Sequence, residues 1–198
     1  MRLDHLVVTC ADLEAGTNWV EERLGLTVQE GGRHAFMGTH NRLLSLGPDE
    51  YLEVIAPDPA ASHPGAPRWF ALDRRSAPAL TNWMVRTGDL DAALAAMPAG
   101  IGTPYDAARG DLRWRVALQA DGELPFGGAC PGLLQWQGPH PAPALRDVGC
   151  RLAALRVTTP HAEALSAALR LDDARVEIAE GPLSIGAEFD TPEGRRAL

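Results

Sequence analysis

The sequence of 198 residues predicts an α+β protein built from tandem βαβββ modules with a C-terminal half-module. The first observation is an internal repeat. Residues 3–15 and 80–92 align without a gap, and each copy contains a short strand pattern, a turn and the start of a helix. The second observation is that short strand patterns, separated by turn residues, follow each of these helices. The third is a fainter copy of the strand, turn and helix pattern that begins near Leu152.

The first module is predicted over residues 1–57. Asp12 is placed to cap a helix over residues 13–24, because its carboxylate can accept hydrogen bonds from the free N–H groups of the first turn. Gly25 is placed to end this helix. After the helix, a Gly-Gly turn and a Gly-Pro-Asp turn separate three strand patterns, at residues 27–29, 40–46 and 51–56.

A Pro-rich linker is predicted over residues 58–79, and the second module over residues 80–137. Asp89 is the expected N-cap of a helix over residues 90–97. Two strand patterns follow this helix, at residues 112–119 and 132–137.

The tail, residues 150–198, is predicted as an additional βαββ half-module that packs on the same domain. Thr159 is the expected N-cap of its helix, with Pro160 at the first helical position. Strand patterns follow at residues 175–179 and 184–189, and a tight turn then precedes a last short strand.

The charged residues exclude several kinds of chemistry. All 18 basic residues are Arg, so the chain has no Lys for a Schiff base or for a phosphate-binding loop. The 26 acidic residues give a formal net charge of -8, which argues against nucleic acid or an anionic membrane as a partner. The N-terminus lacks the apolar core of a signal peptide, and the three cysteines form no CxxC pair. We therefore expect a cytoplasmic protein whose partner is a small molecule.

His5 and Glu53 are the strongest candidates for a site. His5 lies in the first strand pattern, and Glu53 stands between Leu52 and Val54, where a carboxylate is costly to bury without a partner. Imidazole and carboxylate are the groups that divalent zinc, manganese, nickel or iron accept as ligands. For His5 the alternative is a hydrogen-bonded core histidine, and for Glu53 it is pairing with an Arg or with several donors.

A second candidate is the polar segment at residues 38–42, which opens a strand. Because side chains alternate along a strand, His40 and Arg42 are expected on one face and Asn41 on the other. The planar guanidinium of Arg42 suits a substrate carboxylate or phosphate. The equally weighted alternative is that the segment is only a turn and the start of a strand. The remaining histidines are expected to face solvent or to be structural: His34, His63, His140 and His161.

The repeat allows the two modules to be compared. Asn82 corresponds to His5, and Gln135 corresponds to Glu53 when Leu-Leu-Gln-Trp is aligned with Tyr-Leu-Glu-Val. Neutral amides are poor ligands for transition metals, but they hydrogen-bond well to an oxygen-rich ligand.

This arrangement resembles the glyoxalase-like domain proteins of the vicinal oxygen chelate superfamily. The resemblance covers residues 1–137, and the tail looks like the extra half-module of some glyoxalase-like sequences. It rests on Leu-Asp-His-Leu-Val-Val at 3–8, Asp-Leu-Glu-Ala at 12–15, Arg-Leu-Gly-Leu at 23–26, Gly-Thr-His-Asn-Arg-Leu-Leu at 38–44 and Tyr-Leu-Glu-Val-Ile-Ala-Pro at 51–57.

The resemblance implies two βαβββ modules whose curved sheets join into an open barrel around one cavity. In the superfamily, the first and last strands of each module direct metal ligands into this cavity. Carried over by position, these places are His5, Glu53, Asn82 and Gln135. The resemblance leaves open whether the cavity closes within one chain or across a homodimer.

Three hypotheses follow from the resemblance. The first is a metal-dependent lyase or isomerase in which His5, Glu53 and Gln135 hold a divalent Zn, Ni, Mn or Fe ion. In this hypothesis Glu53 or a bound water moves a proton. The small oxygenated substrate is contacted by His40, Asn41, Arg42 and Asn82. The second is a non-catalytic binding or resistance protein. The third is a ring-cleaving dioxygenase, for which the sequence lacks a second matched His.

Overall fold

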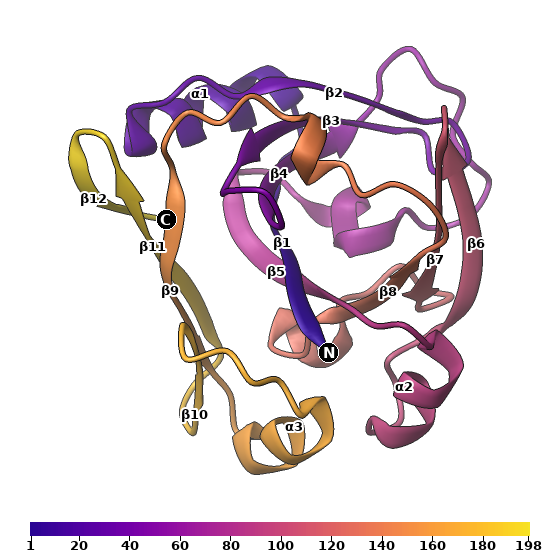
Figure 1. The fold of residues 1–198 in the computed structure, drawn as a ribbon. Helices are drawn as coiled ribbons and strands as arrows, with labels where there is room; N and C mark the ends of the chain where they lie inside the picture. Colours follow the sequence, from indigo (N-terminus) through magenta and orange to yellow (C-terminus); the bar gives the residue numbers. More distant parts are fainter.

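The computed structural model describes residues 1–198 and contains two sheets, both drawn in Figure 1. The larger sheet has eight strands in the order β2-β3-β4-β1-β5-β8-β7-β6, and it curls into an open barrel. The smaller sheet has four strands in the order β10-β9-β11-β12. The predicted fold class, an open curved barrel with an additional C-terminal unit, is confirmed.

The chain forms its elements in an order that repeats. The first half of the barrel consists of β1 (Arg2–Thr9), α1 (Leu13–Leu24), β2 (Gln29–His34), β3 (Thr39–Ser45) and β4 (Tyr51–Pro57). The second half consists of β5 (Ala79–Arg86), α2 (Leu90–Ala96), β6 (Thr103–Arg109), β7 (Leu112–Leu118) and β8 (Gly132–Trp136). The tail consists of β9 (Arg151–Thr158), α3 (Ala162–Leu169), β10 (Val176–Ala179), β11 (Ser184–Thr191) and β12 (Gly194–Ala197). The division into units at residues 57, 80, 137 and 150 stays a prediction.

The two halves of the barrel are joined by antiparallel pairing of β1 with β5. In this register Leu6 lies opposite Trp83, and these two residues also correspond to one another in the sequence repeat. A pseudo-twofold axis therefore passes between them. At the other ends of the sheet, the edge strands β2 and β6 approach one another and nearly close the barrel.

Helix α1 covers the outside of the first half. Asp12 caps it by accepting a hydrogen bond from the Ala15 N–H at 2.8 Å, and Gly25 ends it with a left-handed backbone. Gly16 lies on the buried face, where a Cβ atom would overlap the Cys10 side chain. The close approach of α1 to Cys10 and to β4 therefore depends on a glycine.

Three predicted element boundaries were wrong. The Gly-Gly pair is not a turn, because β2 runs through it and ends at His34. No strand was predicted over β6, whose outer residues are exposed and which contains Pro104, as edge strands tolerate. Helix α3 begins at Ala162 with His161 as its cap position, not after Thr159.

The linker between the halves enters the barrel instead of passing over its surface (Figure 1). A short 3₁₀ segment, η1 (Trp69–Arg74), places Trp69, Phe70 and Leu72 in the buried core beside β4. Phe70 and Ala71 have left-handed backbones with φ of 59° and 53°, and the Ala71 N–H donates to the Gly122 carbonyl at 2.8 Å. The linker therefore lines part of the inside of the barrel.

The tail packs on the outside of the barrel and shares its main core. Strand β9 has β10 as a parallel neighbour and β11 as an antiparallel neighbour, as β1 has β4 and β5. Leu152 and Phe189 belong to the same buried cluster as Leu3 and Trp83. The Arg175 guanidinium also pairs with the Glu50 carboxylate at 2.8 Å and 2.5 Å.

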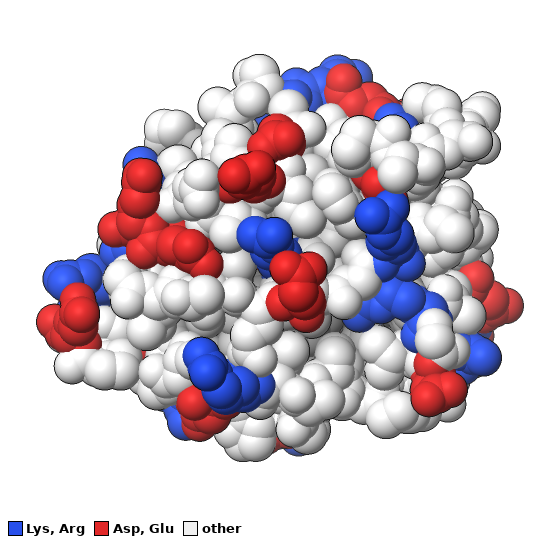
Figure 2. Space-filling model, turned by 90° about the horizontal axis from the view of Figure 1, so that it is seen from above, with Lys and Arg blue, Asp and Glu red and all other residues white.

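Arg and acidic side chains are interspersed in small groups on the face shown in Figure 2. Several Arg residues pair with a carboxylate on a neighbouring element, as Arg115 pairs with Asp91 at 2.8 Å. No helix in the structure has the length and apolar character that crossing a membrane requires.

Candidate functional site

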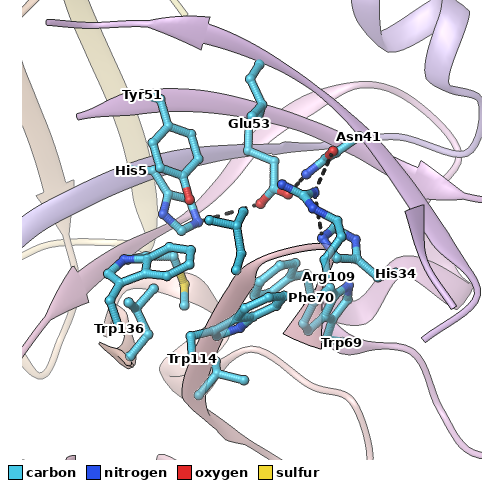
Figure 3. A pocket seen from close by; sticks show the side chains of 15 residues that line it. His5, His34, Asn41, Tyr51, Glu53, Trp69, Phe70, Arg109, Trp114 and Trp136 are labelled. Carbon is cyan, nitrogen blue, oxygen red and sulfur yellow. Dashed lines mark hydrogen bonds and ion pairs between the residues drawn. The ribbon is translucent and has the colours of Figure 1, made fainter. Parts of the chain in front are cut away.

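A cavity of about 470 Å³, part of it open to solvent, lies inside the barrel between its two halves (Figure 3). Its walls are aromatic and aliphatic, and five of its lining residues are polar or charged: His5, His34, Asn41, Glu53 and Arg109. The aromatic residues of the wall are Tyr51, Trp69, Phe70, Trp114 and Trp136. A concave apolar site with a few convergent polar groups is typical of small-molecule binding.

His5 and Glu53 lie side by side on one wall of this cavity. They come from adjacent parallel strands, β1 and β4, and the His5 Nε2 atom lies 3.5 Å from Glu53 Oε2. The other ring nitrogen, Nδ1, lies 2.6 Å from Oδ1 of the fully buried Asp4. The Tyr51 ring stacks on the His5 ring with centroids 4.4 Å apart. Asp4 and Tyr51 therefore fix the orientation of His5.

These contacts make His5 a cation and Glu53 an anion at neutral pH. Burial lowers the pKa of His5, but its interactions with Asp4 and Glu53 outweigh burial and raise that pKa to about 9. Burial raises the pKa of Glu53, but its interactions with His5, His34 and Asn41 outweigh burial and lower that pKa to about 2. The cavity therefore contains a buried ion pair that is held by a second carboxylate, Asp4.

Asp4 also contacts other side chains through its second carboxylate oxygen. Its Oδ2 atom accepts hydrogen bonds from Trp136 Nε1 at 3.0 Å, and it lies 3.0 Å from His140 Nε2 and 3.4 Å from Arg86 Nη1. Burial raises the pKa of Asp4, but the interactions with His140 and His5 more than reverse this and hold it well below its usual range. A carboxylate that stays ionised behind His5 stabilises the imidazolium form of that ring.

A second polar group lies beside Glu53 (Figure 3). The Asn41 side-chain N–H donates to Glu53 Oε1 at 2.5 Å, and its Oδ1 accepts from Arg109 Nη1 at 3.1 Å. The same Nη1 lies 3.1 Å from Nε2 of His34. Burial, with the nearby charge of Arg109, lowers the pKa of His34 to about 4, so His34 is neutral and its Nε2 can accept this hydrogen bond.

The structure brings together three of the predicted site residues: His5, Glu53 and Asn41. It does not bring Gln135 to the cavity, because Gln135 lies on the other face of β8 from Leu134 and Trp136. There the Gln135 side chain accepts from the Leu90 N–H at 3.2 Å and donates to the Gly88 carbonyl at 2.7 Å, which supports the start of α2.

The register shows which residue corresponds to Glu53 in the second half. Val7 lies opposite Glu53, and its counterpart Met84 lies opposite Gly132. Gly132, which has no side chain, therefore stands where Gln135 was expected. The sequence alignment was displaced by an odd number of residues, and such a displacement moves every side chain to the other face of a strand.

His40 and Arg42 also lie away from the cavity. They are on the outer face of β3, where they line a separate groove with Asp12 and Asp58, and Arg42 lies 3.3 Å from the Glu30 carboxylate. Asn82 does point into the barrel, but it lines an adjoining cavity that Trp69 and Phe70 separate from His5 and Glu53. The predicted alternation of residues 40–42 is correct, and only Asn41 is on the cavity side.

The residues present do not fit the metal centre that the superfamily implies. Of the four expected ligand positions, only His5 and Glu53 converge, because Asn82 is in the adjoining cavity and Gly132 has no side chain. No three His, Cys, Asp or Glu side chains gather in a way that could hold an ion.

Sequence reasoning missed Arg109 and His34, and it did not use Asp4. His34 was expected to face solvent or to be structural, but it lines the cavity, buried at 4% exposure at the end of β2. Arg109 belongs to the strand that was not predicted, and the alternation of Ala107 with Arg109 on its inward face was the available signal. Asp4, directly before His5, was visible in the sequence as a carboxylate inside an apolar strand.

The family profile of the glyoxalase-like domain matches residues 3–172 of this chain. The fold is similar to the crystal structure of a hypothetical protein from Staphylococcus aureus, with a TM-score of 0.63 and 13% identity, over 92% of this chain and 87% of that chain. It is less similar to methylmalonyl-CoA epimerase from Mycobacterium tuberculosis, with a TM-score of 0.44 and 22% identity, over 69% of this chain and 88% of that chain. A search of the curated proteins found no match.

The two βαβββ halves, the cavity between them and the family match agree with the resemblance seen in the sequence. The chain therefore belongs to the glyoxalase-like domain family.

Proposed function

We propose that the cavity binds a small oxygenated molecule and that His5 and Glu53 exchange a proton with it, as in an isomerase or lyase. The observation that supports this most strongly is the His5–Glu53 ion pair, buried in a cavity whose other walls are aromatic. A buried acid and base with opposite pKa shifts in one cleft are typical of functional sites.

The mechanism starts from the ionised pair. Glu53 is in its base form, and His5 has an N–H on Nε2 to offer. A carbonyl oxygen that accepts this N–H replaces Glu53 as its partner, and the carboxylate becomes more basic as its interaction with the imidazolium weakens. Glu53 can then remove a proton from the carbon next to the carbonyl, while the electron pair moves onto the oxygen that His5 stabilises. Return of the proton, or loss of a leaving group, completes the reaction.

The distances leave room for this exchange. At 3.5 Å the His5 Nε2 and Glu53 Oε2 atoms are farther apart than in a charge-assisted hydrogen bond, which is typically about 2.7–2.9 Å. Asp4 holds the far side of the imidazole and Asn41 holds the far oxygen of Glu53.

A second candidate is a binding protein without catalysis. The low pKa of Glu53, about 2, favours this alternative because a carboxylate of that strength is a weak base until its partner is displaced. The metal-dependent lyase and the ring-cleaving dioxygenase are less favoured. The dioxygenase needs two His and one carboxylate on one ion, and the second histidine of the cavity, His34, is occupied by Arg109.

The test is proton exchange in D₂O, followed by ¹H NMR on a panel of neutral hydroxyketones and small 2-oxo acids. We expect the protein to accelerate loss of the signal from the C–H next to the carbonyl, and Glu53→Gln to abolish this acceleration. Glu30→Gln is the matched control, since Glu30 is an exposed carboxylate on β2 outside the cavity. Binding without exchange supports the non-catalytic alternative, and absence of both overturns the proposal.

The metal hypothesis is tested separately, by elemental analysis and by thermal unfolding with added Zn²⁺, Ni²⁺, Mn²⁺ and Fe²⁺. We expect no stoichiometric metal and no shift that depends on His5. A stoichiometric ion that is lost in His5→Asn would restore the metal-dependent lyase or isomerase.

A further inference from the structure

We propose that Arg109 binds a carboxylate of the ligand, so that the cavity selects small organic acids with a flat apolar body. This inference rests on the proposed function, because it assumes that the cavity is a ligand site. It adds the chemical class of the ligand and a residue that determines specificity.

The first observation is that Arg109 has donors to spare. Both of its side-chain hydrogen bonds come from Nη1, to Asn41 Oδ1 and to His34 Nε2. Its guanidinium forms no ion pair, whereas Arg115 on the next strand is paired with Asp91. The Nε and Nη2 donors of Arg109 therefore have no hydrogen-bond partner within the chain, and the side chain is part of the cavity lining. A guanidinium with free donors matches a planar carboxylate through two parallel hydrogen bonds.

The second observation is that the barrel makes room for this side chain. Arg109 comes from the end of β6 and reaches across the open seam to β2 and β3. It passes over Gly32, where a Cβ atom would lie 2.8 Å from Arg109 Cδ and 2.9 Å from its Nε. The neighbouring Gly31 likewise makes room for Asn41. The Gly-Gly pair within β2 therefore admits the guanidinium to the cavity.

The third observation is the surrounding chemistry. Trp69, Trp114 and Trp136 provide flat apolar walls, which suit an aromatic or other planar body. The ionised Glu53 close by disfavours a dianion, so a carboxylate fits better than a phosphate. With its carboxylate on Arg109, a small acid would place its body among the aromatic rings and its neighbouring carbon toward His5 and Glu53, as the arrangement in Figure 3 allows.

The test compares acids with isosteric amides. Phenylacetate and phenylacetamide, benzoate and benzamide, and phenylphosphonate are titrated into the protein, and binding is followed by the fluorescence of the cavity tryptophans and by calorimetry. We expect the acids to bind more tightly than the amides. Arg109→Gln should weaken acid binding by about tenfold to a hundredfold, the effect of a charge-assisted hydrogen bond, and change amide binding by less than about threefold.

Three further variants keep the test independent of damage to the fold. Arg113→Gln is the charge control, because Arg113 is exposed on β7 and donates only to the backbone carbonyls of Gly110 and Leu112. Gly32→Ala displaces Arg109 without altering it and should also reduce the preference for acids. Gly138→Ala, where a Cβ atom would meet nothing within 4 Å, should not.

The outcomes separate the two proposals. If acids and amides bind equally well to the wild type and to Arg109→Gln, the inference about Arg109 is overturned and the proposed function stands. Preference for phenylphosphonate over both carboxylates also overturns the inference, because it assigns the guanidinium to a phosphate-type anion. If none of these compounds binds and the NMR panel shows no exchange, both the proposed function and the inference about Arg109 are wrong.

Discussion

At the residue scale, the protonation state of His5 connects the cavity to the stability of the fold. His5 is a buried cation between two carboxylates, Asp4 and Glu53, and its pKa is raised to about 9 in the folded chain from an ordinary value of 6.5. A group whose pKa is raised by folding contributes stability that is fully present below its unfolded pKa. That contribution is lost as the pH rises through the folded value.

This gives a prediction for the pH dependence of stability. The difference in free energy of unfolding between the wild type and His5→Asn should be largest at or below pH 6.5. It should decrease by on the order of 3 kcal/mol as the pH rises through about 9. Urea unfolding at pH 6, 7.5 and 9.5 measures it. His63→Asn is the control, because His63 is exposed. A difference that stays constant from pH 6 to 9.5 would show that His5 is not a buried cation.

The candidate site was predictable from the sequence where a single residue carried the signal. Glu53 stands between two apolar neighbours and His5 lies in a strand, and the structure places both in the cavity. Arg109 was not predictable in this way, because its function depends on the seam between two edge strands that are far apart in the sequence. Gln135 was predicted wrongly for another reason. Its motif resembles that of Glu53 in residue type, but the strand register aligns Glu53 with Gly132, an odd number of residues away from Gln135.

At the element scale, the packing of α1 on the sheet depends on Gly16. In most helices a change from Gly to Ala stabilises by up to about 1 kcal/mol. Here we expect the opposite, because the new methyl group would overlap the Cys10 side chain and lie 3.0 Å from Val54 Cγ1. Overpacking of this kind destabilises by roughly 1–3 kcal/mol.

Chemical denaturation of Gly16→Ala measures this effect. Asn18→Ala, on the exposed face of the same helix, is the matched control and should raise the free energy of unfolding by a few tenths of a kcal/mol. Equal stabilisation by both substitutions would mean that α1 does not pack against Cys10 and β4 as closely as described.

The elements that the sequence predicts well are those with strong local signals. Asp12 and Asp89 both cap helices as expected, with hydrogen bonds of 2.8 Å and 3.0 Å to the N–H groups of Ala15 and Ala92. The edge strands β2 and β6 were shortened or missed, because Gly31 and Gly32 resemble a turn and the outer face of β6 is polar. Their identity is set by pairing with β3 and β7, which local patterns do not contain.

At the scale of the whole molecule, the tail and the barrel share one core. Phe189, in β11, is fully buried in the same cluster as Leu3 and Trp83 of the barrel. All five tryptophans lie at or before residue 136, so their fluorescence reports on the barrel alone. Far-ultraviolet circular dichroism reports on both sheets.

We therefore expect Phe189→Ala to destabilise the barrel as well as the tail. The cavity left by the ring should lower the free energy of unfolding by about 3–5 kcal/mol, and the transitions seen by fluorescence and by circular dichroism should still coincide. Leu183→Ala, in the same tail but 52% exposed, should change stability by less than about 0.5 kcal/mol. If the fluorescence transition of Phe189→Ala matches that of the wild type, the tail unfolds as a separate unit.

The proposed function requires the His5–Glu53 pair to act on a small molecule inside the barrel. The most direct measurement is the rate of deuterium exchange at C3 of phenylpyruvate in D₂O, which the panel of 2-oxo acids includes, with wild-type protein, Glu53→Gln and buffer alone. We expect exchange well above the buffer rate with the wild type and at the buffer rate with Glu53→Gln. If the acid binds but Glu53→Gln exchanges as fast as the wild type, Glu53 is not the base and the proposed mechanism is wrong.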